Sequence, residues 1–287
     1  MARKRPARRP WRDRAGRLSW LKLAVFVLLF VPGAVMAMQL AADALGARQL
    51  NALIHLTGLW TIRLVLVSLA VTPFRLLLDW PGLPVVRRMV GVAAMVYGLA
   101  HLALYVVDQN FDLPHIASEI ALRFYLTIGF AALLGLVALG VTSTDAMVRR
   151  LGTQWKRLHR SAYAIGALGV FHAALQSKAN VGEAMIMAGL LVWLILWRLL
   201  PAGWQQRRVV LLALALVSAS ATAGLEYARY AFATRIPAER VLAATLAPSW
   251  DALRPAHWVM LVTVAVALAA SVRLPRRTAG ARTPARG

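Results

Sequence analysis

The chain has 287 residues, of which 60% are hydrophobic, and its mean hydropathy is +0.63. This is too apolar for a soluble domain and predicts a polytopic membrane protein. The net charge is +22, and the basic residues flank apolar runs, as is typical of membrane proteins. No nucleic-acid partner is therefore expected. Because the chain has no cysteine, disulfides, cysteine-ligated iron–sulfur clusters and covalently attached c-type haem are excluded.

A basic tail opens the chain at residues 1–18, and its eight Lys and Arg side chains predict a cytoplasmic segment. The apolar run that follows, from Ser19 to about Leu40, is long for the hydrophobic region of a signal peptide and has the length of a membrane span. We therefore expect an uncleaved first transmembrane helix and an outer loop within residues 19–50.

Seven more apolar segments have the length and composition of membrane spans. They lie near residues 57–74, 89–107, 124–142, 161–177, 184–200, 209–226 and 257–274. The sequence thus predicts an all-α, polytopic membrane bundle of about eight transmembrane helices. Five of the segments fall in a region at 51–201, two more in 202–274, and a second basic tail follows at 275–287.

Lysine and arginine are distributed unevenly over the loops of this topology. With the N-terminus inside, the inner segments hold 24 of these residues and the outer loops 7. This bias predicts that both termini lie in the cytoplasm.

Histidines within the apolar segments are the candidate functional residues, because a buried imidazole is costly without a partner. His101 and His172 lie on spans that run in the same direction, each about 17–18 Å from the inner end of its helix. Two imidazoles at one depth can provide both axial ligands of a b-type haem iron. Gly98, Gly166 and Gly169 precede them and allow either a flat macrocycle or another helix to approach closely. From the residues alone, haem ligation and hydrogen bonding between helices are both open, and no repeat of fixed period is evident.

His159 precedes His172 by 13 residues, about 20 Å along a helix, but the two side chains point about 140° apart. They share a face only if the helix bends, for example near the two glycines between them. The position on the third span that would face His159 holds Arg87 or Arg88, so a second pair of histidines is not available. His159 is therefore open to ligation with an unusual partner, to a role as an alternative ligand, or to a bond with a propionate or another cofactor.

The remaining polar side chains near the spans have ordinary interpretations beside functional ones. His55 is expected to face headgroups or make a structural bond, with the outer haem as the alternative, while His115 and His257 are expected at solvated or interfacial positions. Arg63 would reach a propionate or extend toward the interface. The basic inner loop can bind haem propionates, a flavin phosphate or an acidic partner, or serve only as a topology signal that touches anionic lipid. This loop contains Arg149, Arg150, Lys156 and Arg157.

The sequence lacks the motifs of several other classes of membrane protein. No Asp or Glu falls in the middle of a predicted span, with Glu226 at a helix end as the nearest case, and this weakens a transporter or ion-pump function. No GxGxxG or GxxxxGK[ST] phosphate loop is present, so a nicotinamide and FAD domain is not in this polypeptide.

Several motifs together resemble a known family. They are HLTGLW (55–60), LAVTPFRLL (69–77), RRMVGVAAMVYGLAHLALY (87–105), RFYLTIG (123–129) and GVTSTDAMVRRLGTQWKRLHRSAYAIGALGVFH (140–172). These stretches resemble the MsrQ (YedZ) family of haem-binding membrane subunits, within the ferric-reductase-like transmembrane family. The resemblance covers about residues 51–201, with Phe124 where the family usually has proline, and it does not extend to the last two predicted helices.

The resemblance implies a haem b subunit in the bacterial inner membrane, with one or two haems and in some members FMN. His101, His159 and His172 fall on the family's functional histidines, and Arg87, Arg88 and Arg157 become candidates for holding the cofactors. Such a subunit takes electrons from quinol or a cytoplasmic flavin reductase and passes them to a periplasmic molybdopterin subunit that reduces oxidised methionine. It carries electrons and has no catalytic residue for a substrate of its own. The alternative is a cytochrome b subunit of another oxidoreductase, such as a ferric reductase.

Overall fold

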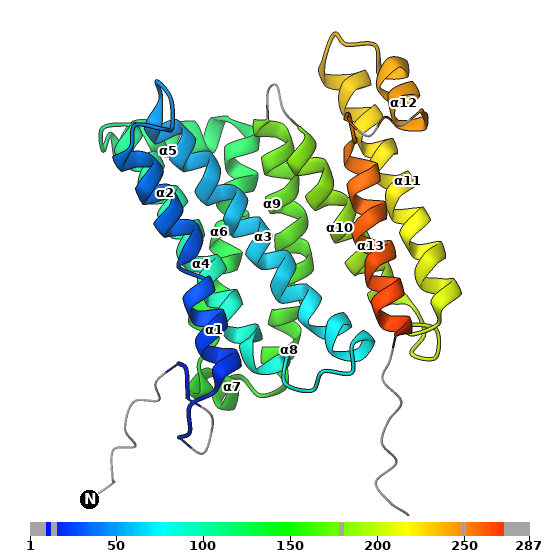
Figure 1. Ribbon diagram of the computed structural model, residues 1–287. Helices are drawn as coiled ribbons and strands as arrows, with labels where there is room; N and C mark the ends of the chain where they lie inside the picture. Colours follow the sequence, from blue (N-terminus) through cyan, green and yellow to red (C-terminus); the bar gives the residue numbers. More distant parts are fainter. Residues whose placement is uncertain (1–9, 13–15, 178–180, 248, 250, 273–287) are drawn as a thin grey trace, which may run out of the picture.

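The computed structural model of the protein describes residues 10–12, 16–177, 181–247, 249 and 251–272 (Figure 1). Apart from one isolated bridge between Arg12 and Leu18, all regular structure in these residues is helical. The predicted all-α membrane bundle is therefore confirmed. Most of the N-terminal tail at 1–18 and all of the C-terminal tail at 275–287 lie outside the described residues.

The first predicted span is present as two successive helices, α1 (Trp20–Leu28) and α2 (Val31–Ala41). The chain turns at Leu29 and Phe30, directly before the Val31–Pro32 peptide. Pro32 lacks the backbone N–H that would bond to the carbonyl group of Leu28 in a continuous helix, so the hydrogen bonds of α1 are interrupted here and α2 begins anew. With the two turn residues between them, the two helices form an apolar segment of 22 residues, enough to cross a bilayer.

Five further helices in the described part of the chain are long and apolar enough to span a membrane. They are α3 (Gln49–Leu77), α4 (Pro84–Asp108), α6 (Phe124–Val141), α10 (Gly182–Leu199) and α11 (Arg208–Ala233). The predicted spans at 161–177 and 257–274 are occupied by shorter helices, α9 (Ala162–Gln176, 15 residues) and α13 (Pro255–Ser271, 17 residues). Every predicted span thus contains a helix, and the total of eight crossings stays a prediction.

Four short helices connect the longer ones: α5 (Leu113–Leu122), α7 (Asp145–Leu151), α8 (Thr153–Arg160) and α12 (Ala238–Leu246). Gly152 separates α7 from α8 with a φ of +52°, a conformation that glycine adopts without the steric penalty of a side chain. The chain can therefore turn sharply within the basic inner segment, and α8 brings its polar side chains back toward the bundle.

A four-helix arrangement holds the candidate histidines. α3 packs against both α4 and α9, and α6 packs against the same two helices, so α4 and α9 are diagonal to each other. The core that these helices share with α10 contains fully buried Leu69, Leu77, Ala94 and Trp197. In a bilayer such packing stabilises the bundle through van der Waals contacts between helices, because apolar side chains gain nothing by moving from lipid into the core. α10 joins this bundle to α11 and α13, which lie to one side together with α12 (Figure 1).

The first turn of α1 and the last turn of α13 lie at the same end of the bundle (Figure 1). α7 and α8, which carry the basic inner segment, are at this end as well. The arrangement agrees with a topology in which both ends of the chain are on one side of the membrane. That this side is the cytoplasm rests on the charge distribution.

Candidate functional site

Two histidine rings from diagonal helices lie next to each other, toward the end of the bundle that the charge distribution predicts to be the outer one. The ring centroids of His101 on α4 and His172 on α9 are 6.4 Å apart, and the ring planes are inclined at 84°. A metal–nitrogen bond of about 2 Å places the centroids of two imidazoles on one iron about 6 Å apart. The separation therefore fits a single iron atom between the two rings.

Backbone carbonyl groups fix the protonation of both rings. Nδ1 of His101 is 2.7 Å from the carbonyl oxygen of Ile54, and Nδ1 of His172 is 2.8 Å from that of Tyr125. Because a carbonyl oxygen only accepts, Nδ1 is the atom that donates in each ring. The neutral ring then keeps its lone pair on Nε2, which is the arrangement that metal-ligating histidines usually show.

Glycines on neighbouring helices make room for both rings. A Cβ at Gly58 would lie 3.0 Å from Nδ1 of His101, and a Cβ at Gly129 would lie 2.6 Å from Nδ1 of His172. By contrast, Gly166 faces Val65 and Leu69 of α3 and has a role in helix packing. The glycines adjacent to the histidine rings are thus on α3 and α6, and not those that precede the histidines in the sequence.

The two halves of this site repeat each other. Each histidine lies 47 residues after the residue whose carbonyl it binds. The second set follows the first by 71 residues at every position: Ile54 to Tyr125, Gly58 to Gly129 and His101 to His172. The structure therefore corrects the expectation that the chain has no repeat, and the same glycine-to-histidine spacing in both halves was the sequence signal that could have revealed it.

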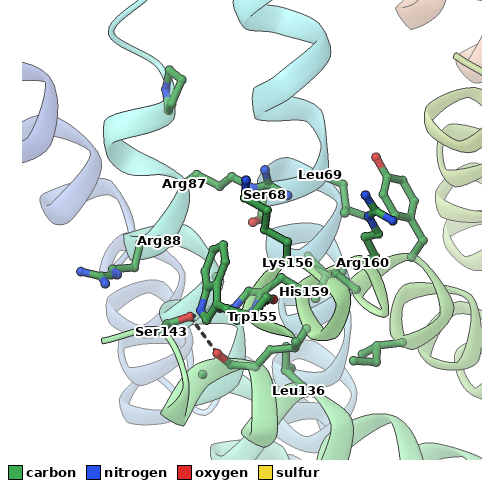
Figure 2. A pocket seen from close by; sticks show the side chains of 18 of the residues that line it. Ser68, Leu69, Arg87, Arg88, Leu136, Ser143, Trp155, Lys156, His159 and Arg160 are labelled. Atoms are coloured by element: carbon green, nitrogen blue, oxygen red, sulfur yellow. Dashed lines mark hydrogen bonds between the residues drawn. The ribbon is translucent and has the colours of Figure 1, made fainter. Parts of the chain in front are cut away.

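A second feature of the bundle is a cavity of about 420 Å³ at the end near α7 and α8. Its interior is apolar and includes Val65, Leu69 and Leu136. Figure 2 shows the side chains of His159, Trp155 and several cations arranged around it. An apolar interior with a basic rim fits a flat organic group that carries anionic substituents.

His159 is held firmly at the edge of this cavity. Its ring stacks on Trp155 with a centroid distance of 3.9 Å, and its Nδ1 donates to the Trp155 carbonyl oxygen over 3.1 Å. Nε2 lies 3.3 Å from the hydroxyl of Ser143. Burial holds the pKa of His159 below its ordinary value, and the positive charges of Arg87 and Arg88 lower this pKa further. The ring is thus neutral at pH 7, as a ligand or hydrogen-bond acceptor must be.

The cations at the rim come from three parts of the chain. Arg87 and Arg88 are at the start of α4, as predicted, and Arg88 also forms an ion pair with Asp145 over 2.8 Å. Arg157, which the sequence analysis grouped with them, is not among the residues that line the cavity. The additional cations that line it are Lys156 and Arg160 of α8 and Arg198 at the inner end of α10.

The helix that carries both His159 and His172 is interrupted. α8 ends at Arg160 and α9 begins at Ala162, with Ser161 as the break. Gly166 and Gly169, named above as an example of where a bend could be, both lie inside regular α9, so the break is at Ser161 instead. Because of this interruption, the direction of the His159 side chain is not set by the helical geometry of α9.

Two charged residues differ from expectation. Arg63 forms an ion pair with Glu183 over 2.8 Å, and its guanidinium lies over the ring of Trp60. The sequence predicted neither of these two contacts. Glu226 is not at a helix end, because α11 continues to Ala233. Its carboxylate is buried and forms an ion pair with Arg254 over 2.7 Å. The described part of the chain thus does contain a carboxylate inside a membrane helix, but one that is already paired.

The other three histidines have different surroundings. His55 directly follows Ile54, whose carbonyl group bonds His101, and it lies within electrostatic range of both His101 and His172. His115 is exposed at the start of α5 and His55 is exposed in the first turns of α3. His257 is neither solvated nor free, because Nδ1 accepts a hydrogen bond from the backbone N–H of Arg254 and Nε2 donates to the carbonyl oxygen of Thr245. Its role is to cap the start of α13.

The sequence of this chain is similar to those of known proteins. Residues 57–170 match the model of a family described as ferric reductase like transmembrane component. A protein-methionine-sulfoxide reductase heme-binding subunit MsrQ from Rhodospirillum rubrum is 43% identical over 198 residues, which cover 93% of the relative and 68% of this chain. The chain belongs to the MsrQ family.

Other MsrQ proteins are similar over comparable lengths. Those of Xanthomonas campestris and Azospira oryzae are 40% and 38% identical, over 84% and 79% of their own lengths. No solved structure matches the chain. Membership in this family, together with the apolar helices, makes the chain a multi-pass protein of the bacterial inner membrane. Because the relative from R. rubrum is matched almost completely while a third of this chain is not, this member is longer than that relative.

Proposed function

We propose that this chain is a haem b-binding membrane subunit that delivers electrons to a periplasmic methionine sulfoxide reductase. The observation that carries the proposal is the pair of imidazoles at 6.4 Å, each with Nδ1 donating to a carbonyl group. When bound, haem supplies a reversible one-electron couple at its iron. His101 and His172 are the residues that would hold this iron.

The chain's own residues contribute orientation and insulation to this site. Gly58 and Gly129 allow the rings to approach α3 and α6, and the carbonyl groups of Ile54 and Tyr125 keep the rings in the ligating tautomer. The helices around the rings are apolar, which lowers the local dielectric constant. These are the means by which a protein sets the potential of a bound redox group.

The inner cavity is the proposed place for a second anionic cofactor. His159 presents Nε2 near this cavity, and Arg87 and Arg88 offer charge to propionate or phosphate groups. Since Arg88 occupies the position that corresponds to His159 in the 71-residue repeat, two histidines are not available there. A second haem with His159 as its protein ligand and FMN held through its phosphate are the two occupants that fit.

The proposed partners follow from the two sides of the bundle. The outer site would serve a periplasmic molybdopterin catalytic subunit, which reduces methionine sulfoxide in envelope proteins. The inner end would receive electrons from quinol or from a cytoplasmic flavin reductase. The proposal receives support from the printed names of the relatives, which are heme-binding subunits of protein-methionine-sulfoxide reductase.

The experiment is expression of the full chain with ample haem, followed by purification and a pyridine haemochrome assay. We expect a Soret band, b-type difference peaks and at least one haem per chain. Replacement of His101 or His172 by alanine should remove the outer haem, whereas His115→Ala, at an exposed position, should retain it. Equal haem content in all these variants would rule the assignment out.

A second candidate function is a cytochrome subunit that serves another acceptor, and the match to the ferric-reductase-like family model favours it. The two functions share the haem site and differ only in the recipient of the electrons. Reduced protein reconstituted in liposomes should be reoxidised by a periplasmic methionine sulfoxide reductase in the presence of methionine sulfoxide. Reoxidation by a ferric chelate alone would favour the second function.

A further inference from the structure

The outer end of α11 reaches the helix that carries His172. Nη2 of Arg229 donates to the carbonyl oxygen of Ser177 over 3.1 Å, and Ser177 is the C-cap residue that directly follows the last residue of α9. Nη1 of the same guanidinium lies 3.4 Å from the carbonyl oxygen of Ala233, in the last turn of α11. One arginine therefore contacts the C-terminal ends of two helices.

Apolar contacts accompany this hydrogen bond. Tyr230, the next residue of α11, and Ala173, the residue after His172, both pack against a small buried cluster. The cluster joins the end of α9 to the start of α10 and consists of Ala174, Val181, Ala184 and Met185. The ends of three helices thus meet directly beside a proposed haem ligand.

The position of His172 makes this junction important. His172 lies four residues before the end of α9, and the last carbonyl groups of a helix have no partner within the helix. A helix end without such partners frays, and fraying here would release the turn that contains His172. A guanidinium at this end supplies a hydrogen bond and a positive charge where the helix dipole is negative.

We propose that Arg229 is a positioning residue for His172, which keeps the imidazole in place by closing the C-terminal end of α9. This inference rests on the proposed haem function. It also gives a role to α11, which lies beyond the part of the chain that resembles the family by its motifs. The guanidinium is suited to the task because it can bond two carbonyl groups in a fixed geometry, whereas an ammonium group acts as a point charge.

The test compares the full-length variants Arg229→Met and Arg229→Lys with the unaltered protein. Methionine keeps the length of the side chain but removes the donors, while lysine can still donate to the Ser177 carbonyl group. In Arg229→Met we expect the ferrous haem to bind carbon monoxide faster by about tenfold, the factor that loss of one hydrogen bond of ordinary strength allows. Arg229→Lys should restore most of the unaltered rate. Arg235→Met is the matched control, because Arg235 is exposed in the same outer segment.

The outcomes separate this inference from the proposed function. An unaltered protein without haem would contradict the proposed function itself. Haem in the unaltered protein together with an unchanged carbon monoxide rate and unchanged haem spectra in Arg229→Met would overturn the role of Arg229. If Arg229→Met does not fold, the rate and spectra of Arg229→Lys decide the question. In that case a carbon monoxide rate of Arg229→Lys above that of Arg235→Met supports the proposal, and a rate and spectra identical to those of the Arg235→Met control contradict it.

Discussion

Nδ1 of His172 on α9 lies 2.8 Å from the backbone carbonyl oxygen of Tyr125 on α6. The equivalent bond in the other half of the bundle joins His101 to Ile54 over 2.7 Å. Each proposed ligand is therefore oriented by a neighbouring helix and not by its own. Because the bond belongs to the backbone, side-chain substitution at Tyr125 or Ile54 would leave it in place, and the shape of the bundle is what sets the ligand geometry.

If His101 and His172 hold a haem iron as proposed, the angle between their rings predicts the EPR signal of that iron. The planes of His101 and His172 are inclined at 84°, which is close to perpendicular. Perpendicular imidazole ligands leave two iron d orbitals nearly equal in energy, so the oxidised haem should give a strongly anisotropic low-spin EPR signal. The measurement is EPR of the purified ferric protein at low temperature. The ordinary rhombic signal of parallel ligands would contradict the ring orientation described here.

Gly129→Ala tests the space beside His172. The added Cβ would lie 2.6 Å from two atoms of the ring, a distance at which something must shift. Overpacking of this kind costs about 1–3 kcal/mol, and here the group that must move is the ring of His172, the proposed ligand. We expect a lower haem content and a changed EPR signal with the helical content retained. Gly224→Ala on α11 is the control, because a Cβ there meets nothing within 4 Å; similar spectra for both variants would argue against the crowding.

The sequence predicts the helices well because long apolar runs have few alternatives in a membrane. It also singles out His101 and His172, since their depth follows from counting residues along helices. The break at Ser161 could not be predicted, because neither proline nor glycine marks it. The same holds for Gly58, Gly129 and Arg229, whose importance lies in contacts with distant helices. Only the repeated spacing from glycine to histidine could have indicated part of this set.

The protonation of His159 predicts how stability depends on pH. Its pKa lies below the ordinary value of 6.5, chiefly because of burial, so the folded protein binds a proton less readily than the unfolded chain. The contribution of the neutral ring is complete above pH 6.5 and is lost as the pH falls through the lowered pKa. Between about pH 7.5 and 5.5 the thermal midpoint of unaltered protein should fall more than that of His159→Gln, which cannot be protonated in this range. Parallel pH profiles for the two proteins would show that the ring does not contribute in this way.

The buried ion pair between Glu226 and Arg254 predicts a strong asymmetry between single and double variants. The carboxylate of Glu226 is 2% exposed and accepts two hydrogen bonds from the guanidinium, at 2.7 and 3.4 Å. Removal of one partner leaves a buried charge unpaired, which typically costs about 3–5 kcal/mol, whereas replacement of both by apolar groups is often nearly neutral. Glu226→Leu should therefore unfold at a clearly lower temperature in detergent, and Glu226→Leu with Arg254→Met should recover much of the loss. Glu239→Leu, at an exposed site on α12, should change the midpoint little. If the loss of stability in the double variant equalled the sum of the losses in the two single variants, Glu226 and Arg254 would not be coupled. The apolar contacts alone would then hold α11 and α13 together.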